Sequence, residues 1–208
     1  MEDVLGVYTR PYDPRRPQVC LDETSRQLLG EVTPSLPPAT GRPVREDYEY
    51  VRQGVCNVFL VCEPLAGWRQ VTVSDRRTRI DWAHCIKDLV EVHYPDAERI
   101  VLVQDNLNTH TPASLYEAFA PAEAKRLADR LELHYTPKHG SWLNMAEIEL
   151  AMLTQQCLDR RLADRATLER EAAAWQAARN RAGRGVNWRF TTKDARIKLR
   201  HLYPTTHD

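Results

Sequence analysis

Residues 99–110 have the sequence RIVLVQDNLNTH, in which a short apolar run meets a polar segment that begins with an acid. The run is rich in β-branched residues and does not alternate with polar ones, which is typical of a central parallel strand buried on both faces. A strand of that kind needs helices on both faces of its sheet. The stretch therefore predicts an α/β domain in which Asp105 follows the carboxyl end of a central strand.

The segments on either side of this stretch supply the rest of such a sheet. Strands are expected at 17–24, 54–63, 68–73 and 131–135. Helices are expected at 80–94, at 112–130 with a break near Pro121, at 145–161 and at 167–181. We expect residues 1–16 to be irregular. The order predicts a mixed five-stranded sheet flanked by helices, in a single domain over 1–208 with its core at about 17–165.

The segment 31–50 contains four prolines and cannot form a regular helix or a central strand. Long excursions inside a compact domain are uncommon and often functional. We therefore expect 31–50 to be a functional insert that protrudes from the domain.

Three acids occupy comparable positions in this scheme. Asp22 lies near the end of the first expected strand, Asp105 follows the central strand, and Glu147 lies in the first turn of a helix. Ligand sites of open α/β sheets form outside the carboxyl ends of the strands. Carboxylates that converge there suit Mg²⁺ or Mn²⁺, and two such ions support phosphoryl transfer.

Each acid also has a purely structural explanation. Asp22 could cap a turn, and Asp105 could form an Asx turn. Asn144 and Glu147 have the spacing of a capping box, which needs no catalysis. Glu149 is an alternative third ligand, and only one of the two acids can serve, because residues two apart on a helix point in different directions.

Taken in order, VCLDET, VLVQDNLNTHTP and HYTPKHGSWLNMAEIE resemble the bacterial insertion-sequence branch of the mariner transposase superfamily. Asp105, Asn106 and His110 match an Asp-Asn-x-x-x-His block of that family, and Asn144 and Glu147 match an Asn-Pro-Ile-Glu block. The middle of the last block is Met-Ala here, and the 42 positions from Asp105 to Glu147 exceed the usual gap. The resemblance covers about 11–204.

This resemblance implies a ribonuclease-H-like (retroviral-integrase-like) fold and a catalytic triad of Asp22, Asp105 and Glu147 that holds two Mg²⁺ or Mn²⁺ ions. It implies transposon ends and target DNA as substrates, and a homodimer in the active complex to which the insert 31–50 contributes. Asn106 and His110 are expected to orient Asp105 or to touch the scissile phosphate, although His110 could equally pack against the sheet. Lys138, His139 and Trp142 could contact phosphate or stack on bases, or could be ordinary exposed loop residues.

The carboxyl-terminal part is strongly basic. Residues 176–203 contain eight Lys or Arg residues against one acid, Asp194. This basic tail predicts a polyanion partner, although a solvated helix face would have the same composition. Its basic residues are Arg179, Arg181, Arg184, Arg189, Lys193, Arg196, Lys198 and Arg200.

Composition bears on the cellular compartment of the protein and on the role of its cysteines. The chain is 42% hydrophobic and 28% charged, with no apolar run of membrane-spanning length and no signal-peptide pattern, so a cytoplasmic protein is expected. The resemblance implies a bacterial protein associated with the nucleoid. Its five cysteines form no C-x-x-C pair, which argues against a disulfide framework or a zinc site. A helix-turn-helix module is not expected in this chain and could be a separate partner. The alternative function is a truncated, non-catalytic fragment that binds DNA or transposase and regulates transposition.

Overall fold

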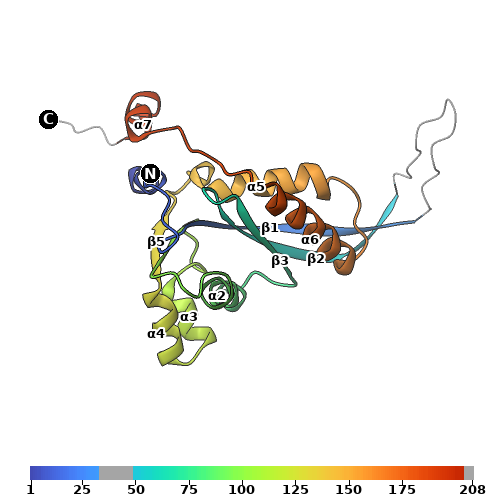
Figure 1. Ribbon diagram of the computed structural model, residues 1–208. Helices are drawn as coiled ribbons and strands as arrows, with labels where there is room; N and C mark the ends of the chain where they lie inside the picture. The colour runs from blue at the N-terminus through green and yellow to red at the C-terminus, as the bar shows by residue number, and fades with distance from the viewer. Residues whose placement is uncertain (33–48, 204–208) are drawn as a thin grey trace.

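The computed structural model describes residues 1–32 and 49–203, which form a mixed five-stranded sheet covered by helices on both faces (Figure 1). The strands are β1 (Gln18–Glu31), β2 (Tyr50–Glu63), β3 (Trp68–Ser74), β4 (Ile100–Gln104) and β5 (Leu131–Tyr135). The longer helices are α1 (Glu2–Tyr8), α2 (Arg79–Asp88), α3 (Pro112–Ala118), α4 (Pro121–Asp129), α5 (Met145–Leu153), α6 (Arg165–Ala182) and α7 (Thr192–Lys198). Short turns are η1 (Leu89–His93), η2 (Ser141–Leu143), η3 (Thr154–Leu158) and η4 (Arg200–Leu202).

The strand order is β3-β2-β1-β4-β5. β1, β2 and β3 form an antiparallel meander, whereas β4 pairs in parallel with both β1 and β5. All five residues of β4 are buried, as the apolar run predicts for a central strand. Strand alternation sends Val101 and Val103 to one face and Ile100 and Leu102 to the other.

Each face of the sheet has its own hydrophobic core. The face that contains Val101 and Val103 packs against α1, α5, α6 and α7, and the opposite face packs against α2, α3 and α4 (Figure 1). Helix ends are fixed by local signals, because Thr78 and Asp81 form a capping box on α2 and Gly183, with φ 57°, closes α6 in the left-handed conformation. The expected α/β class and mixed sheet are therefore confirmed.

The expectation that residues 1–16 are irregular is wrong for their first half, because Glu2–Tyr8 is helical. Val4, Leu5, Val7 and Tyr8 are buried in the α5 face of the core, and the Tyr8 hydroxyl donates to the Leu143 carbonyl (2.7 Å). Tertiary packing stabilises this short helix, which its local sequence does not mark.

The strands that flank the insert are longer than predicted. β1 and β2 remain paired out to Glu31 and Tyr50, and this two-stranded arm extends beyond the helices (Figure 1). Arg161 contacts the outer end of this arm by donating to the Glu49 carbonyl (3.2 Å) and by lying over the Tyr50 ring. The central part of the expected insert, 33–48, lies outside the described residues.

The five cysteines are free, and Cys20, Cys56 and Cys62 are buried as small apolar residues. Within the described part of the chain, no helix is both long and apolar enough to cross a lipid bilayer.

Candidate active site

Three carboxylates from separate elements line one open cavity of about 480 Å³. Asp22 lies on β1, Asp105 directly follows β4, and Glu147 lies in the first turn of α5. The parallel register pairs Leu21 with Gln104, so the next residue on each strand is one of the two aspartates. Chain topology alone therefore places Asp22 beside Asp105, although 82 residues separate them along the chain.

Asn144 positions the third carboxylate. Its side-chain oxygen accepts a hydrogen bond from the Ala146 amide (3.1 Å) and caps α5, while its side-chain nitrogen donates to the Leu21 carbonyl (2.8 Å). The second bond ties the start of α5 to the residue before Asp22. The capping box considered for Asn144 and Glu147 does not form, which leaves the Glu147 side chain free to face the cavity.

The three carboxylates of the cavity lie close together and have no positively charged side chain beside them among the described residues. Burial, followed by the negative charge of Asp105, raises the pKa of Asp22 to about 7, and Glu147 adds to this effect. The Glu23 amide donates to Asp22 Oδ1 (2.8 Å) and opposes the shift, and Asp105 Oδ1 accepts from the Thr136 hydroxyl (2.9 Å). Within the described residues, neither Asp22, Asp105 nor Glu147 forms an ion pair with a basic side chain.

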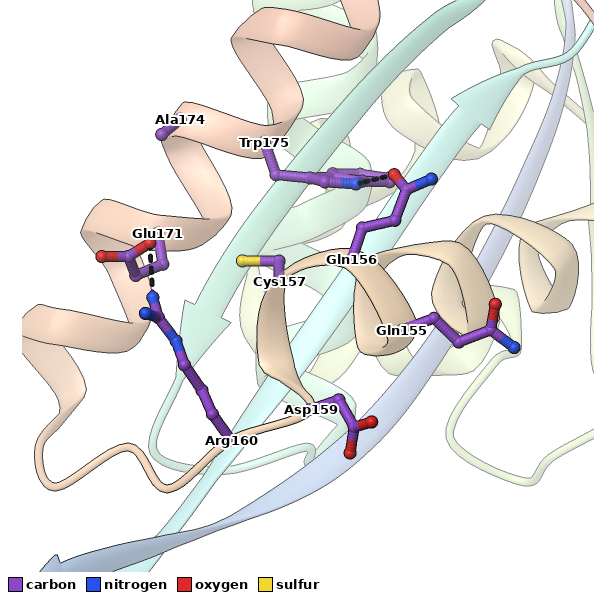
Figure 2. Close-up of a pocket in the computed structure, with 8 residues that line it drawn as sticks. All are labelled: Gln155, Gln156, Cys157, Asp159, Arg160, Glu171, Ala174 and Trp175. Atoms are coloured by element: carbon purple, nitrogen blue, oxygen red, sulfur yellow. Dashed lines mark hydrogen bonds and ion pairs between the residues drawn. The ribbon is translucent and has the colours of Figure 1, made fainter. Parts of the chain in front are cut away.

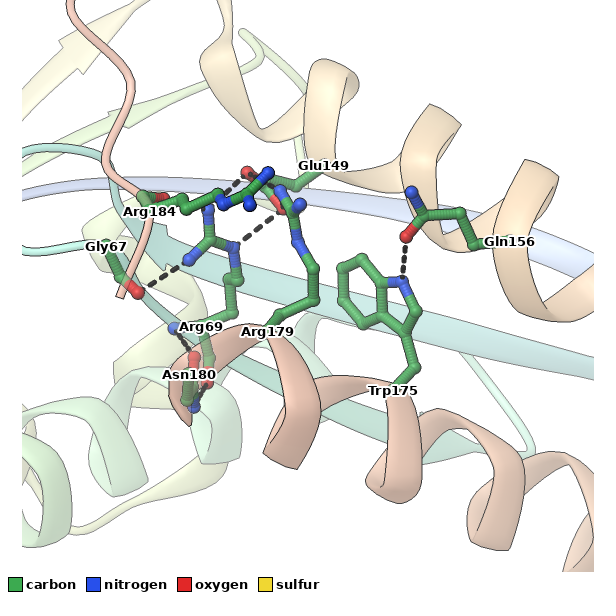
Figure 3. Close-up of polar contacts among 8 residues, drawn as sticks. All are labelled: Gly67, Arg69, Glu149, Gln156, Trp175, Arg179, Asn180 and Arg184. Atoms are coloured by element: carbon green, nitrogen blue, oxygen red, sulfur yellow. Dashed lines mark hydrogen bonds and ion pairs between the residues drawn. The ribbon is translucent and has the colours of Figure 1, made fainter. Parts of the chain in front are cut away.

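Glu149, the alternative third acid, is on the opposite side of α5. Both of its oxygens accept from Arg69 (2.7 Å each), and Arg179 also contacts it (3.1 Å) (Figure 3). Glu149 and Arg69 are almost fully buried, so this carboxylate is neutralised inside the core. The residue that faces the cavity is Glu147.

The donor set of the cavity fits hard divalent cations. Carboxylate oxygens are the preferred protein ligands of Mg²⁺ and Mn²⁺, and the missing positive charge is the one such ions supply. Among the residues that the structure describes, no three His, Cys, Asp or Glu side chains stand in an arrangement ready to enclose an ion.

The two polar residues predicted beside Asp105 lie in different environments. Asn106 is exposed on the loop after β4. His110 is buried, and its ring stacks on Trp82 with the ring centres 5.9 Å apart. In this conformation His110 contacts protein on all sides and does not reach a surface where DNA could lie.

Lys138 and His139 are exposed on the loop between β5 and α5. They line a second hollow of about 360 Å³ with Asn106, and this hollow shares Asp105 and Ser141 with the carboxylate cavity. His139 has φ 63°, which turns the loop back toward the cavity. A strand of nucleic acid that crosses the carboxylates would therefore also pass these two side chains.

The basic residues of the tail differ in whether their side chains form an ion pair within the protein or are exposed. Arg179 is committed to Glu149, and Arg196 forms an ion pair with Glu2 (2.7 Å) on the surface. The other basic residues of the tail are exposed, namely Arg181, Arg184, Arg189, Lys193, Lys198 and Arg200. Phe190 of the tail packs edge-on against Trp142, next to Ser141 of the cavity wall, so the tail runs past the site.

Another hollow of about 360 Å³ lies between η3 and α6 and contains no predicted site residue (Figure 2). Its main polar groups satisfy one another: Arg160 pairs with Glu171 (2.6 Å), and the Trp175 indole donates to Gln156 (2.9 Å). Its contacts are those of packing between two helices.

Sequence reasoning missed Glu23, which lines the carboxylate cavity and is nearly buried. The acid is visible in the sequence beside Asp22, but strand alternation places neighbouring side chains on opposite faces. Its contact with His110, 87 positions away, depends on the pairing of β1 with β4 and has no local signal.

Asp22 is the fifth residue of β1, which continues to Glu31, so the expectation that it lies near the end of its strand is wrong. A β3-β2-β1-β4-β5 mixed sheet with one acid on β1, one directly after β4 and one on α5 defines the ribonuclease-H-like class. Residues 17–169 match the family model described as DDE superfamily endonuclease, and the chain belongs to that family. A comparison with curated proteins gave no match.

Solved structures of Mos1 transposase share this fold. The Mos1 mariner paired end complex with Mn superposes with a TM-score of 0.55 at 14% identity, over 84% of this chain and 52% of that chain. The Mos1 strand transfer complex gives 0.55 at 13% identity, over 84% and 51%. The chain thus corresponds to about half the length of the Mos1 chains, and the expected ribonuclease-H-like fold is confirmed.

Proposed function

We propose that this chain is the catalytic domain of a DNA transposase that cuts phosphodiester bonds at transposon ends and transfers the freed strand into target DNA. The observation that carries the proposal is the convergence of Asp22, Asp105 and Glu147 on one cavity with no basic side chain to neutralise them among the described residues. Membership of the DDE endonuclease family and the likeness to Mos1 complexes support it.

In this proposal Asp22, Asp105 and Glu147 hold two Mg²⁺ or Mn²⁺ ions. Such ions, when bound, activate the attacking oxygen and stabilise the leaving oxygen of a phosphodiester. The protein supplies no nucleophilic side chain, and its own contribution is positioning and electrostatics. Thr136 orients Asp105, and the Asn144 contacts set the height of Glu147 above the strands.

DNA contacts extend the site on both sides. Lys138 and His139 would contact the phosphates next to the scissile one, because their hollow is continuous with the carboxylate cavity. The exposed basic residues of the tail would hold the duplex through its backbone. We also propose that the active complex is a homodimer joined through the β1–β2 arm. A separate DNA-binding module would help to recognise the transposon ends.

The test is a nicking assay on the terminal repeat of the element, with Mn²⁺ or Mg²⁺. We expect metal-dependent cleavage at the transposon end that is lost in Asp22→Asn, Asp105→Asn and Glu147→Gln, whereas the exposed Asp96→Asn serves as the unaffected control. Cleavage that survives all three substitutions would overturn the assignment. DNA binding without cleavage would favour the alternative, a regulatory chain that binds DNA or transposase without cutting.

A further inference from the structure

Glu23 lines the carboxylate cavity and contacts His110, which is buried behind the cavity wall. His110 Nε2 is 3.1 Å from Glu23 Oε2, and the two side chains are 1% and 4% exposed. The contact joins β1, through the residue after Asp22, to the loop that begins at Asp105. The contact is close but lacks the alignment of a hydrogen bond, and Glu23 Oε2 has no hydrogen-bond partner among the described residues.

The His110 ring is held in one orientation. Its Nδ1 is 3.1 Å from the Asp105 carbonyl oxygen, which can only accept, so Nδ1 is the donor. One ring face stacks on Trp82, which is fully buried and donates through its indole to Gln104 (3.0 Å). Trp82 therefore fixes the ring plane and Asp105 fixes its rotation, which leaves Nε2 directed at Glu23.

The main chain of His110 is fixed as well. Its carbonyl accepts from the Gln104 side-chain amide and from the Tyr135 hydroxyl, both at 3.0 Å. The loop 105–110 is thus closed on itself, because its last residue bonds to the carbonyl of its first. Any displacement of His110 would be transmitted to the main chain of Asp105.

We propose that Glu23 and His110 form a positioning pair that fixes the main chain of Asp105 against β1. The pair would set the spacing of Asp22 and Asp105, and so the affinity of the cavity for divalent cations. The effect on cation affinity rests on the proposed function, whereas the structural contact between β1 and the loop 105–110 does not. Groups that orient the ligands of a metal site typically change metal affinity by 10- to 100-fold when removed.

Two substitutions of Glu23 distinguish the effect of side-chain length from the effect of negative charge. Glu23→Gln keeps the length of the side chain and an oxygen that can face His110, and Glu23→Asp keeps the charge but withdraws it by one methylene. His110→Ala removes the other partner. Glu63→Ala is the matched control, because Glu63 is a buried acid of the same sheet that accepts from the Tyr94 hydroxyl (2.8 Å) and lies outside the cavity.

Hydrogen–deuterium exchange of the full chain, without metal, measures the tie itself. We expect faster exchange in peptides covering 105–111 for Glu23→Asp and His110→Ala, near-native exchange for Glu23→Gln, and no local change for Glu63→Ala. Equal exchange of these peptides in wild type, Glu23→Asp and His110→Ala would overturn the pair.

A titration with Mn²⁺ alone measures the affinity of the cavity for the ion. The electron paramagnetic resonance signal of the free ion gives the unbound concentration. Glu23→Asp and His110→Ala should each weaken Mn²⁺ binding about 10-fold, the double variant no further, and Glu23→Gln should lose little. Strong loss in Glu23→Gln with none in His110→Ala would make Glu23 a metal ligand and overturn the positioning role. If the wild-type chain binds no Mn²⁺, the proposed function fails, while the exchange experiment still decides the tie.

Discussion

Glu149 accepts one hydrogen bond from Arg69 on each of its two oxygens, at 2.7 Å, and this paired contact lies two residues from the carboxylate that faces the cavity. Arg69 also donates to the carbonyls of Gly67 (2.5 Å) and Arg184 (2.7 Å), so a single guanidinium joins β3, α5 and the segment after α6 (Figure 3). The rotation of α5 is thereby set: Glu149 is held in the core, and Glu147 is presented to Asp22 and Asp105.

Removing one partner of this pair should destabilise the fold strongly. Glu149→Ala leaves the Arg69 charge buried and unpaired, which costs about 3–5 kcal/mol in the free energy of unfolding. Urea denaturation measures this loss. The control is Asp75→Ala, because the Arg165–Asp75 pair is exposed and should contribute less than about 1 kcal/mol. Similar losses in the two variants would contradict a structural role for Glu149.

Replacing Asp22 should stabilise the protein in the absence of metal. The pKa of Asp22 rises from an ordinary 3.8 to about 7 on folding, so the folded chain binds this proton more tightly than the unfolded chain. The contribution of protonated Asp22 to the free energy of unfolding is therefore fully present below about pH 4 and is lost as the pH rises to about 7. Asp22→Asn escapes this loss, and its advantage in the free energy of unfolding should grow over that window to about 4 kcal/mol.

Thermal melts of both proteins from pH 4 to 8 in a chelator test this expectation, with the exposed Asp96→Asn as the control. Adding Mn²⁺ at pH 8 should raise the Tm of the wild type more than that of Asp22→Asn, because binding to the folded state stabilises it. A Tm advantage of Asp22→Asn that is equal at pH 4 and pH 8 would show that the repulsion assigned to Asp22 is absent.

Asn144→Ala should affect both stability and the site. The substitution removes the cap on the Ala146 amide and the bond to the Leu21 carbonyl at a buried position, at a cost of about 1–3 kcal/mol. Asn144→Asp keeps the cap but cannot donate to Leu21. If the Leu21 bond positions Glu147, both variants should bind Mn²⁺ more weakly than the wild type in calorimetry. Native affinity in Asn144→Asp would show that the cap alone positions α5.

The parts of this fold that the sequence predicts are those with a local cause. The apolar run of β4 is buried on both faces, so it carries no alternation, and Asp105 directly follows it. α1 lacks such a signal, because its burial depends on contacts such as Tyr8 with Leu143, 135 positions away. Local sequence also does not identify the buried residue at the start of α2, where Ile80 is 49% exposed and Trp82 is buried.

Candidate site residues divide in the same way. Asp105 and Glu147 could be predicted because they lie directly after a recognisable strand and in the first turn of a recognisable helix. Asp22 could be predicted because it lies on a recognisable strand, although that strand continues to Glu31. Glu23 and Arg69 could not, because their partners His110 and Glu149 are brought to them only by strand pairing and helix packing. Arg179 was expected to contact DNA with the rest of the tail, but its guanidinium lies against Glu149.

The exposed part of the basic tail should bind DNA through phosphates, with little preference for sequence. Phosphate contacts release counterions, so the logarithm of the affinity falls with the logarithm of salt concentration by about 0.9 for each contact. Substituting Arg189, Lys193 and Arg200 by Ala should therefore reduce the slope by about 2–3 and weaken binding to terminal-repeat and scrambled DNA equally. Arg79, Lys125 and Arg126 are exposed bases of α2 and α4, on the opposite face of the sheet, and their triple Ala variant is the control. Fluorescence anisotropy with both DNAs over a salt series gives the slopes. A large preference of the wild-type chain for the terminal repeat would mean that these 208 residues read sequence themselves, and the need for a separate recognition module would disappear.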